Sequence, residues 1–198
     1  MNPILMDIET NIETDRLLLR IPLPGDGKVV NNAIKNSVNE LRPWLRFVQE
    51  IPSPEETEVN TREAHAKFLS RENLRYLIFL KDTNEFVGST GFHNIDWKVR
   101  KLEIGYWINT SYSGRGYMTE AVDALTEFAL VGLQFARVEI RCESRNYRSR
   151  SIPEKLDFDL EGILRNEDLS VDGKHLTNTC VYAKVTPQSI DELVSKGY

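Results

Sequence analysis

The pattern of apolar and polar positions is most regular between residues 101 and 131. The even-numbered residues from Leu102 to Ile108 are apolar or aromatic. The odd-numbered positions 101, 103 and 105 beside them are lysine, glutamate and glycine. This period of two predicts a strand over residues 101–108. From Met118 to Val131 apolar residues recur at helical spacing opposite a polar side, which predicts an amphipathic helix.

The same reasoning predicts the elements on both sides of this region. Strands are expected at residues 16–21, 75–80, 86–92, 136–142, 162–169 and 176–185, and helices at 27–37, 54–72 and from 146 onward. Three consecutive strands form a meander, whereas the helix that precedes strand 136–142 favours parallel pairing of that strand with its predecessor. Residues 1–14 have no clear period and are expected to form a loose arm.

Composition narrows the classes of protein. The chain has 198 residues, 40% of them apolar and 28% charged, which is typical of one globular domain. The net charge of -5 argues against a general nucleic-acid binder. No apolar run is long enough to span a bilayer, and no charged-then-apolar leader opens the chain, so a cytoplasmic location is expected. Cys142 and Cys180 are isolated and the histidines lack ligand spacing, so no metal is predicted.

A turn with two glycines, Gly114 and Gly116, joins the strand at 101–108 to the helix after it. Glycine lets the backbone approach a ligand closely, and the unpaired N–H groups of a helix start favour an anion. An ordinary glycine turn is the alternative. The turn lacks the lysine and the third glycine of the common nucleotide loops. It resembles the pyrophosphate loop Gln/Arg-x-x-Gly-x-Gly/Ala of the GNAT acetyltransferases, with Ser113 and Met118 at positions where the family usually has other residues.

Other segments carry the same resemblance. The stretch from Thr14 to Arg20 is similar to the Thr-x-Arg-Leu-x-Leu-Arg opening of the ribosomal-protein N-terminal (alanine/serine) acetyltransferase branch. The stretch from Asn146 to Phe158 is similar to Asn-x-x-Ser-x-x-x-x-Glu-Lys-Leu-Gly-Phe, with Asp157 in place of the glycine. Aspartate tolerates the left-handed conformation that the position requires better than most residues.

The resemblance implies a fold and a reaction. It covers residues 12–186 as one α/β domain of GNAT type, a mixed, mostly antiparallel twisted sheet of about seven strands flanked by helices. An arm at 1–11 and a tail at 187–198 complete the chain. The implied activity is acetyl transfer from acetyl-CoA to an amine, preferably a protein or peptide N-terminal α-amine. A small-molecule amine acceptor and a non-catalytic acyl-CoA-binding protein are alternatives. No nucleic-acid or membrane partner is implied, and the expected oligomeric state is a monomer or a homodimer.

The resemblance also assigns residues to the reaction. Acetyl-CoA would contact Trp107, Ile108, Ser113, Gly114, Arg115, Gly116, Tyr117, Met118, Asn146 and Ser149. The Ser149 hydroxyl would donate a hydrogen bond to the leaving sulfur, although capping of its helix by Ser149 or Asn146 is equally natural. Because an α-amine has a pKa of about 7.7–8.0, a carboxylate base is useful, and Asp168 and Glu103 are the candidates. Trp44 either lines the acceptor groove or closes the edge of a core.

Overall fold

The computed structural model describes residues 2–186, and the expected tail at 187–198 lies outside this range. A single sheet has the strand order β1-β2-β3-β4-β5-β6-β8-β7. The strands are β1 (Asn11–Glu13), β2 (Leu17–Arg20), β3 (Leu74–Leu80), β4 (Phe86–Asp96), β5 (Lys101–Ile108), β6 (Arg137–Glu143), β7 (Asp159–Leu169) and β8 (Leu176–Val185). The α-helices are α1 (Gly27–Asn36), α2 (Val38–Leu41), α3 (Pro54–Leu69), α4 (Tyr117–Glu127) and α5 (Tyr147–Lys155). This architecture confirms the predicted α/β fold.

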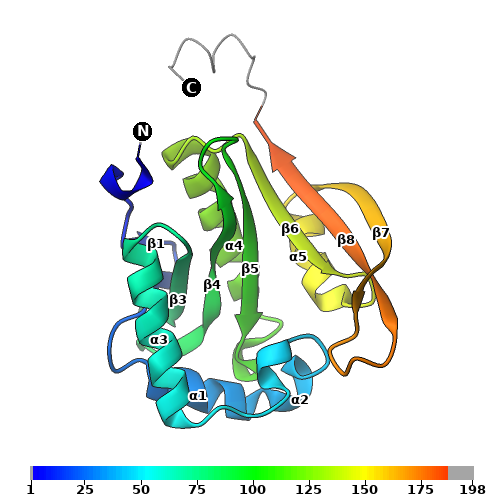
Figure 1. Cartoon of the computed structure of the whole chain (residues 1–198). Coiled ribbons are helices and arrows are strands. Elements are labelled where there is room, and N and C mark those ends of the chain that lie inside the picture. The colour runs from blue at the N-terminus through cyan, green and yellow to red at the C-terminus, as the bar shows by residue number, and fades with distance from the viewer. Residues whose placement is uncertain (1, 187–198) are drawn as a thin grey trace.

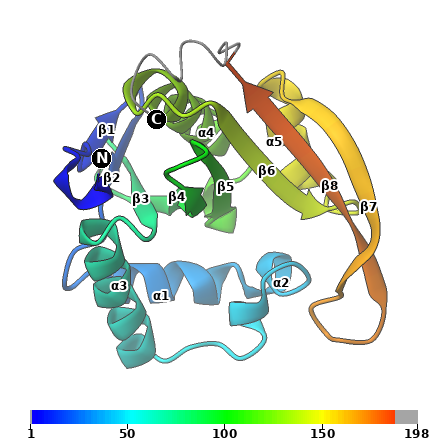
Figure 2. The same ribbon diagram turned by 45° about the horizontal axis from the view of Figure 1, so that its top comes forward.

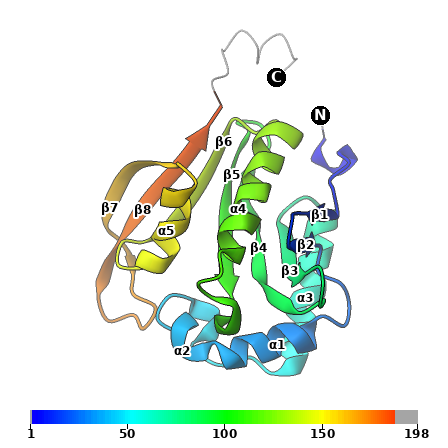
Figure 3. The same ribbon diagram turned by 180° about the vertical axis from the view of Figure 1, so that it is seen from behind.

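Pairing in the sheet is antiparallel except between β5 and β6, which are parallel as the crossover predicted. The helices α1 and α3 lie on one side of the sheet, and α4 and α5 lie on the other (Figures 1, 2 and 3). The main core fills the space between the sheet and α4, where Ala121, Val122 and Leu125 are fully buried. Burial of this apolar face supplies most of the driving force for packing α4 on the strands.

The prediction of a loose arm over residues 1–14 is wrong at 3–5 and at 11–13. A 3₁₀ turn spans Pro3–Leu5, and Asn11–Glu13 adds an eighth strand, β1, at the edge of the sheet. The hydroxyl of Tyr76 also donates a hydrogen bond of 2.6 Å to the carbonyl of Glu9. A strand this short is held by backbone pairing with its neighbour, so it leaves no period in the sequence.

Local rules fix several element ends. Ser53 and Glu56 form a reciprocal capping box at the start of α3. Asp157 follows α5 with φ of 54°, which confirms the left-handed conformation expected at that position. The strand β7 begins at Asp159, a few residues before the expected start. No helix within residues 2–186 combines the length and apolar character that crossing a bilayer requires.

Candidate functional site

The sheet opens between β5 and β6. Only Lys101–Glu103 pairs with Arg137–Glu139, and beyond these residues the two strands diverge (Figure 1). A cavity of about 820 Å³ lies at the opening and extends to the start of α4 and to α5. Its size falls within the range of roughly 300–1,000 Å³ that is typical of ligand pockets.

The glycine turn forms one end of this cavity. Gly114 and Gly116 have φ of 76° and 79°, a left-handed conformation that favours glycine. Gly116 is the N-cap of α4 and offers no side chain to the first N–H groups of the helix. Ser113, Tyr117 and Met118 line the cavity beside the two glycines. The arrangement leaves backbone donors and the positive end of the helix dipole available to an anion.

A carboxylate fastens this turn to the second strand. Glu120 accepts hydrogen bonds from the Thr14 hydroxyl at 2.6 Å and from the Arg16 backbone N–H at 3.0 Å, and it also forms an ion pair with the Arg16 guanidinium at 2.6 Å. Burial alone would raise the pKa of Glu120, but the bonds from Thr14 and Arg16 outweigh it and the pKa is lowered. The motif at residues 14–20 and the first turn of α4 are therefore parts of one structural unit.

Two hydroxyls meet where β5 faces α5. The Ser149 hydroxyl donates to the Tyr106 hydroxyl at 3.2 Å, and the Tyr106 hydroxyl donates to the Ser149 carbonyl at 2.9 Å. Burial raises the pKa of Tyr106, so the phenol stays protonated at neutral pH. The cap of α5 is Asn146, whose side chain accepts from the Ser149 N–H at 3.2 Å. The hydroxyl of Ser149 is therefore not needed for capping.

Glu103 lies in the same cavity next to a histidine. Its carboxylate is 3.3 Å from His93 Nε2, and Asn94 donates to it at 3.0 Å. Burial would raise the pKa of Glu103, but the bonds from His93 and Asn94 hold the pKa below its usual value. At neutral pH the carboxylate is therefore ionised, and its oxygens can accept hydrogen bonds from a group that enters the cavity. Sequence reasoning missed both His93 and Tyr106, although the predicted meander could have located His93 directly opposite Glu103.

The remaining predicted residues divide into two groups. Trp44, Trp107, Ile108 and Asn146 line the cavity with Ser149 and Glu103. Asp168 does not: it is largely exposed on β7, forms a 2.7 Å ion pair with Arg46, and has a pKa lowered first by the Leu169 N–H and then by Arg46. Arg115 is also outside the lining set, because its guanidinium lies over the Tyr112 ring, 5.6 Å from the centroid.

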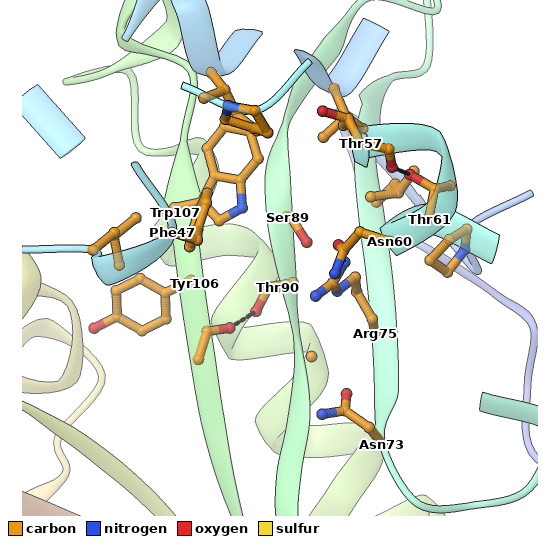
Figure 4. A pocket seen from close by; sticks show the side chains of 18 of the residues that line it. Phe47, Thr57, Asn60, Thr61, Asn73, Arg75, Ser89, Thr90, Tyr106 and Trp107 are labelled. Carbon is orange, nitrogen blue, oxygen red and sulfur yellow. Dashed lines mark hydrogen bonds between the residues drawn. The ribbon is translucent and has the colours of Figure 1, made fainter. Parts of the chain in front are cut away.

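A second cavity of about 500 Å³ lies on the side of the sheet covered by α1 and α3 (Figure 4). It shares Leu45, His93, Gly105, Tyr106 and Trp107 with the first cavity. The C-terminal half of β5, at residues 105–107, therefore lines both cavities. Residues 2–186 contain no group of three or more histidine, cysteine or acidic side chains arranged to hold a metal.

These features define an α/β protein with a split sheet and, beside the split, a helix start with a glycine N-cap that faces a cavity. The sequence profile of the GNAT acetyltransferase domain matches residues 16–159. The chain therefore belongs to the GNAT family of acetyl-CoA-dependent N-acetyltransferases.

Two relatives and one solved structure illustrate the similarity. The protein YdaF of Bacillus subtilis, described provisionally as a ribosomal N-acetyltransferase, is 32% identical over 81% of this chain and 87% of its own length. The ribosomal-protein-serine acetyltransferase of Escherichia coli is 27% identical over 72% of this chain and 75% of its own. The structure of RimL, a ribosomal α-N-protein acetyltransferase, with coenzyme A has a TM-score of 0.81 at 23% identity and covers 88% of this chain and 97% of RimL.

Proposed function

We propose that this chain acetylates the N-terminal α-amine of a protein or peptide of the ribosomal-protein type, with acetyl-CoA bound at the opening between β5 and β6. The observation that carries the proposal is that the glycine turn, the Ser149–Tyr106 hydroxyl pair and Glu103 line one cavity. The E. coli relative, a ribosomal-protein-serine acetyltransferase, supports this choice of acceptor. A cytoplasmic location and a monomeric or homodimeric state belong to the same proposal.

The chain's groups fit a pyrophosphate-bearing thioester. The N–H groups at the start of α4, with Gly114 and Gly116, suit the pyrophosphate because backbone donors there approach an anion without obstruction by side chains. Unpaired backbone at the opening edge of β5, at Trp107 and Ile108, suits the amide groups of a pantetheine arm. Ser113 and Met118 differ from the family pattern, but a loop that binds through its backbone tolerates such changes. When bound, acetyl-CoA supplies the activated acetyl carbonyl.

Residues of β5 and α5 would perform the proton transfers. The amine nitrogen forms a bond to the carbonyl carbon while the carbon–sulfur bond breaks, so the amine loses a proton and the sulfur gains negative charge. Glu103, acting with His93, is our candidate to accept the amine proton. Ser149 and Tyr106 are our candidates to stabilise the leaving sulfur: the Ser149 hydroxyl would turn from Tyr106 to donate to the sulfur, while the bond from Tyr106 to the Ser149 carbonyl holds the pair in the cavity lining. Asp168 remains the alternative base.

The test combines binding with an acceptor panel. Calorimetric titration with acetyl-CoA, with ATP as the control ligand, should give selective binding of acetyl-CoA. A panel of peptides with free N-termini and of small amines is then assayed for coenzyme A release and for acetylated product by mass spectrometry. Turnover of small amines alone would favour a small-molecule acetyltransferase. Binding without turnover of any acceptor would favour a non-catalytic acyl-CoA-binding protein, and lack of binding would refute the proposal.

A further inference from the structure

The floor of the second cavity is a row of three residues across adjacent strands. Arg75 on β3 pairs with Gly91 on β4, which pairs with Gly105 on β5. Gly91 and Gly105 line the cavity beside Arg75 and add no side chain to it. A Cβ atom at Gly91 would collide with the backbone of Leu74 and Arg75, and one at Gly105 would lie 3.0 Å from the His93 ring. The close approach of β3 and of His93 therefore favours glycine at these two positions.

Arg75 is a poorly compensated cation in this cavity. Its guanidinium donates one hydrogen bond, of 2.7 Å, to the side-chain oxygen of Asn60, and no ion pair to it is recorded within residues 2–186. Figure 4 shows the side chain beside Asn60, directed toward the part of the sheet where Ser89 and Thr90 lie. Burial lowers the pKa of Arg75, and no carboxylate counteracts it. A half-buried charge with one neutral partner can be stabilised further by an anionic group that pairs with it.

The acidic residue that lines the cavity does not compensate Arg75. Glu56 accepts a hydrogen bond of 2.7 Å from the Ser53 backbone N–H, as part of the cap of α3. The neighbouring hydroxyls are also engaged, since Ser89 donates to the Tyr76 carbonyl and Thr90 donates to the Gly105 carbonyl. The unused N–H groups of Arg75 are thus the charged donors that this cavity offers to a ligand.

We propose that the second cavity binds the acceptor, and that Arg75 binds a carboxylate group that the acceptor carries close to its reacting amine. The cavity shares Tyr106 and Trp107 with the acetyl-CoA side, so an amine there lies next to the proposed transfer point. Arg75 and Gly105 are two strands apart, about 10 Å between backbones, which keeps amine and carboxylate within one small molecule or the first residues of a peptide.

This inference rests on the proposed acetyltransferase function and specifies its substrate class. The carboxylate has two possible sources. It is either an acidic side chain near a peptide N-terminus or the α-carboxylate of a free amino acid. Both would form a charge-assisted, bidentate pair with the guanidinium, and Asn60 would hold Arg75 in the receptive orientation.

Matched acceptor pairs test the inference. The first pair is a peptide with glutamate at its second and third positions and the same peptide with glutamine there. The second pair is serine and serinamide. Binding is measured by calorimetry in the presence of coenzyme A, where no transfer occurs, and kcat/KM is measured with acetyl-CoA. We expect a preference for the acidic member of one pair of about 10-fold or more, and the pair that shows it identifies the source.

Variants assign the preference to one side chain. Arg75→Gln should bring the acid-to-amide ratio close to 1, and Arg75→Lys should retain part of the preference. Arg62→Gln is the matched control, because Arg62 lies exposed on α3 and pairs with Glu58, and it should leave the ratio unchanged. Ratios below about 2 in both pairs for the native protein, or a full preference in Arg75→Gln, would overturn the inference. If Arg75→Gln fails to fold, Arg75→Lys carries the assignment, and a ratio in Arg75→Lys equal to that of the native protein would overturn the inference.

These outcomes separate the two proposals. A preference seen in binding without any acetyl transfer would support the Arg75 site and contradict the acetyltransferase function. Acetyl transfer without a preference for acidic acceptors would support the function and contradict the Arg75 site. The affinity for acetyl-CoA, measured on each variant, shows whether the other half of the site is intact.

Discussion

The two cavities on either side of β5 are built from different parts of the chain. The larger one depends on backbone features, namely two left-handed glycines, a helix start and an unpaired strand edge. The smaller one depends on side chains that α1, α3 and three strands bring together, with Arg75 as its cation. Backbone donors suit the pyrophosphate, which is the same in every acetyl-CoA molecule. The side chains of the smaller cavity can instead differ among proteins that use different acceptors. Sequence change at Ser113 or Met118 should therefore matter less than change at Arg75.

The largest effect should come from a change to the backbone-built side. Gly116→Asp places a side chain and a negative charge against the proposed pyrophosphate position. We expect the Kd for acetyl-CoA to rise roughly 100-fold or more, because like charges at an interface cost several kcal/mol. Calorimetric titration measures the change. Gly173→Asp is the matched control, since Gly173 has a similar φ of 71° in the β7–β8 turn and lines neither cavity. Tight binding by Gly116→Asp would remove the turn from the cofactor site.

Glu103 lines the first cavity beside His93, which lines both cavities, so we expect its replacement to affect transfer more than the affinity for acetyl-CoA. Glu103→Gln keeps the shape and the acceptor oxygen for Asn94 but cannot take a proton. General-base catalysis is typically worth 10²–10⁴-fold, and we expect kcat/KM to fall about 100-fold. Steady-state kinetics with a peptide acceptor measure it. Asp168→Asn serves as the comparison, with a change of about 2-fold or less. The reverse ranking of these two variants would assign the base to Asp168.

The contrast between local backbone features and side chains from separate elements also explains what the sequence could and could not predict. The strand at 101–108, the glycine turn and α4 follow from local patterns, and the parallel pairing of β5 with β6 follows from the crossover. The extent of that pairing does not, because the register and twist of two separate strands decide where they diverge. Tyr106 and Ser149 are likewise brought together only by the packing of α5 against β5. Arg75 lies in line with Gly91 and Gly105 because the register of three different strands brings them together.

A smaller effect is expected from the hydroxyl pair. Ser149→Ala removes one donor near the leaving sulfur but leaves Tyr106 in place, so kcat should fall about 10-fold while the Kd for acetyl-CoA stays within about 2-fold. The Asn146 cap is kept, because it bonds to the backbone N–H of residue 149. Ser151→Ala is the matched control on the same helix, because Ser151 also lines the cavity but its hydroxyl donates to the Arg148 carbonyl. Equal rates for Ser149→Ala and the native enzyme would exclude a catalytic role for this hydroxyl.

The smallest effect should come from the contact that supports the glycine turn. Glu120→Gln weakens the bonds to Thr14 and Arg16 without touching either cavity floor. We expect a loss of about 1 kcal/mol in the free energy of unfolding at pH 7, at the low end for bonds to a charged group because Arg16 is half exposed. Urea unfolding measures it, and Asp123→Asn, exposed on the same helix, is the control.

The pH dependence of that loss identifies its cause. The pKa of Glu120 is lowered in the folded protein from an ordinary value of 4.5, so the carboxylate contributes stability above pH 4.5. This contribution is lost as the pH falls through the folded pKa, and the difference between Glu120→Gln and the native protein should shrink in the same interval. A difference that stays constant down to pH 3 would mean that the substitution acts through packing instead. In that case the geometry of the larger cavity would depend on α4 and the two glycines, and the ion pair between Glu120 and Arg16 would not contribute to it.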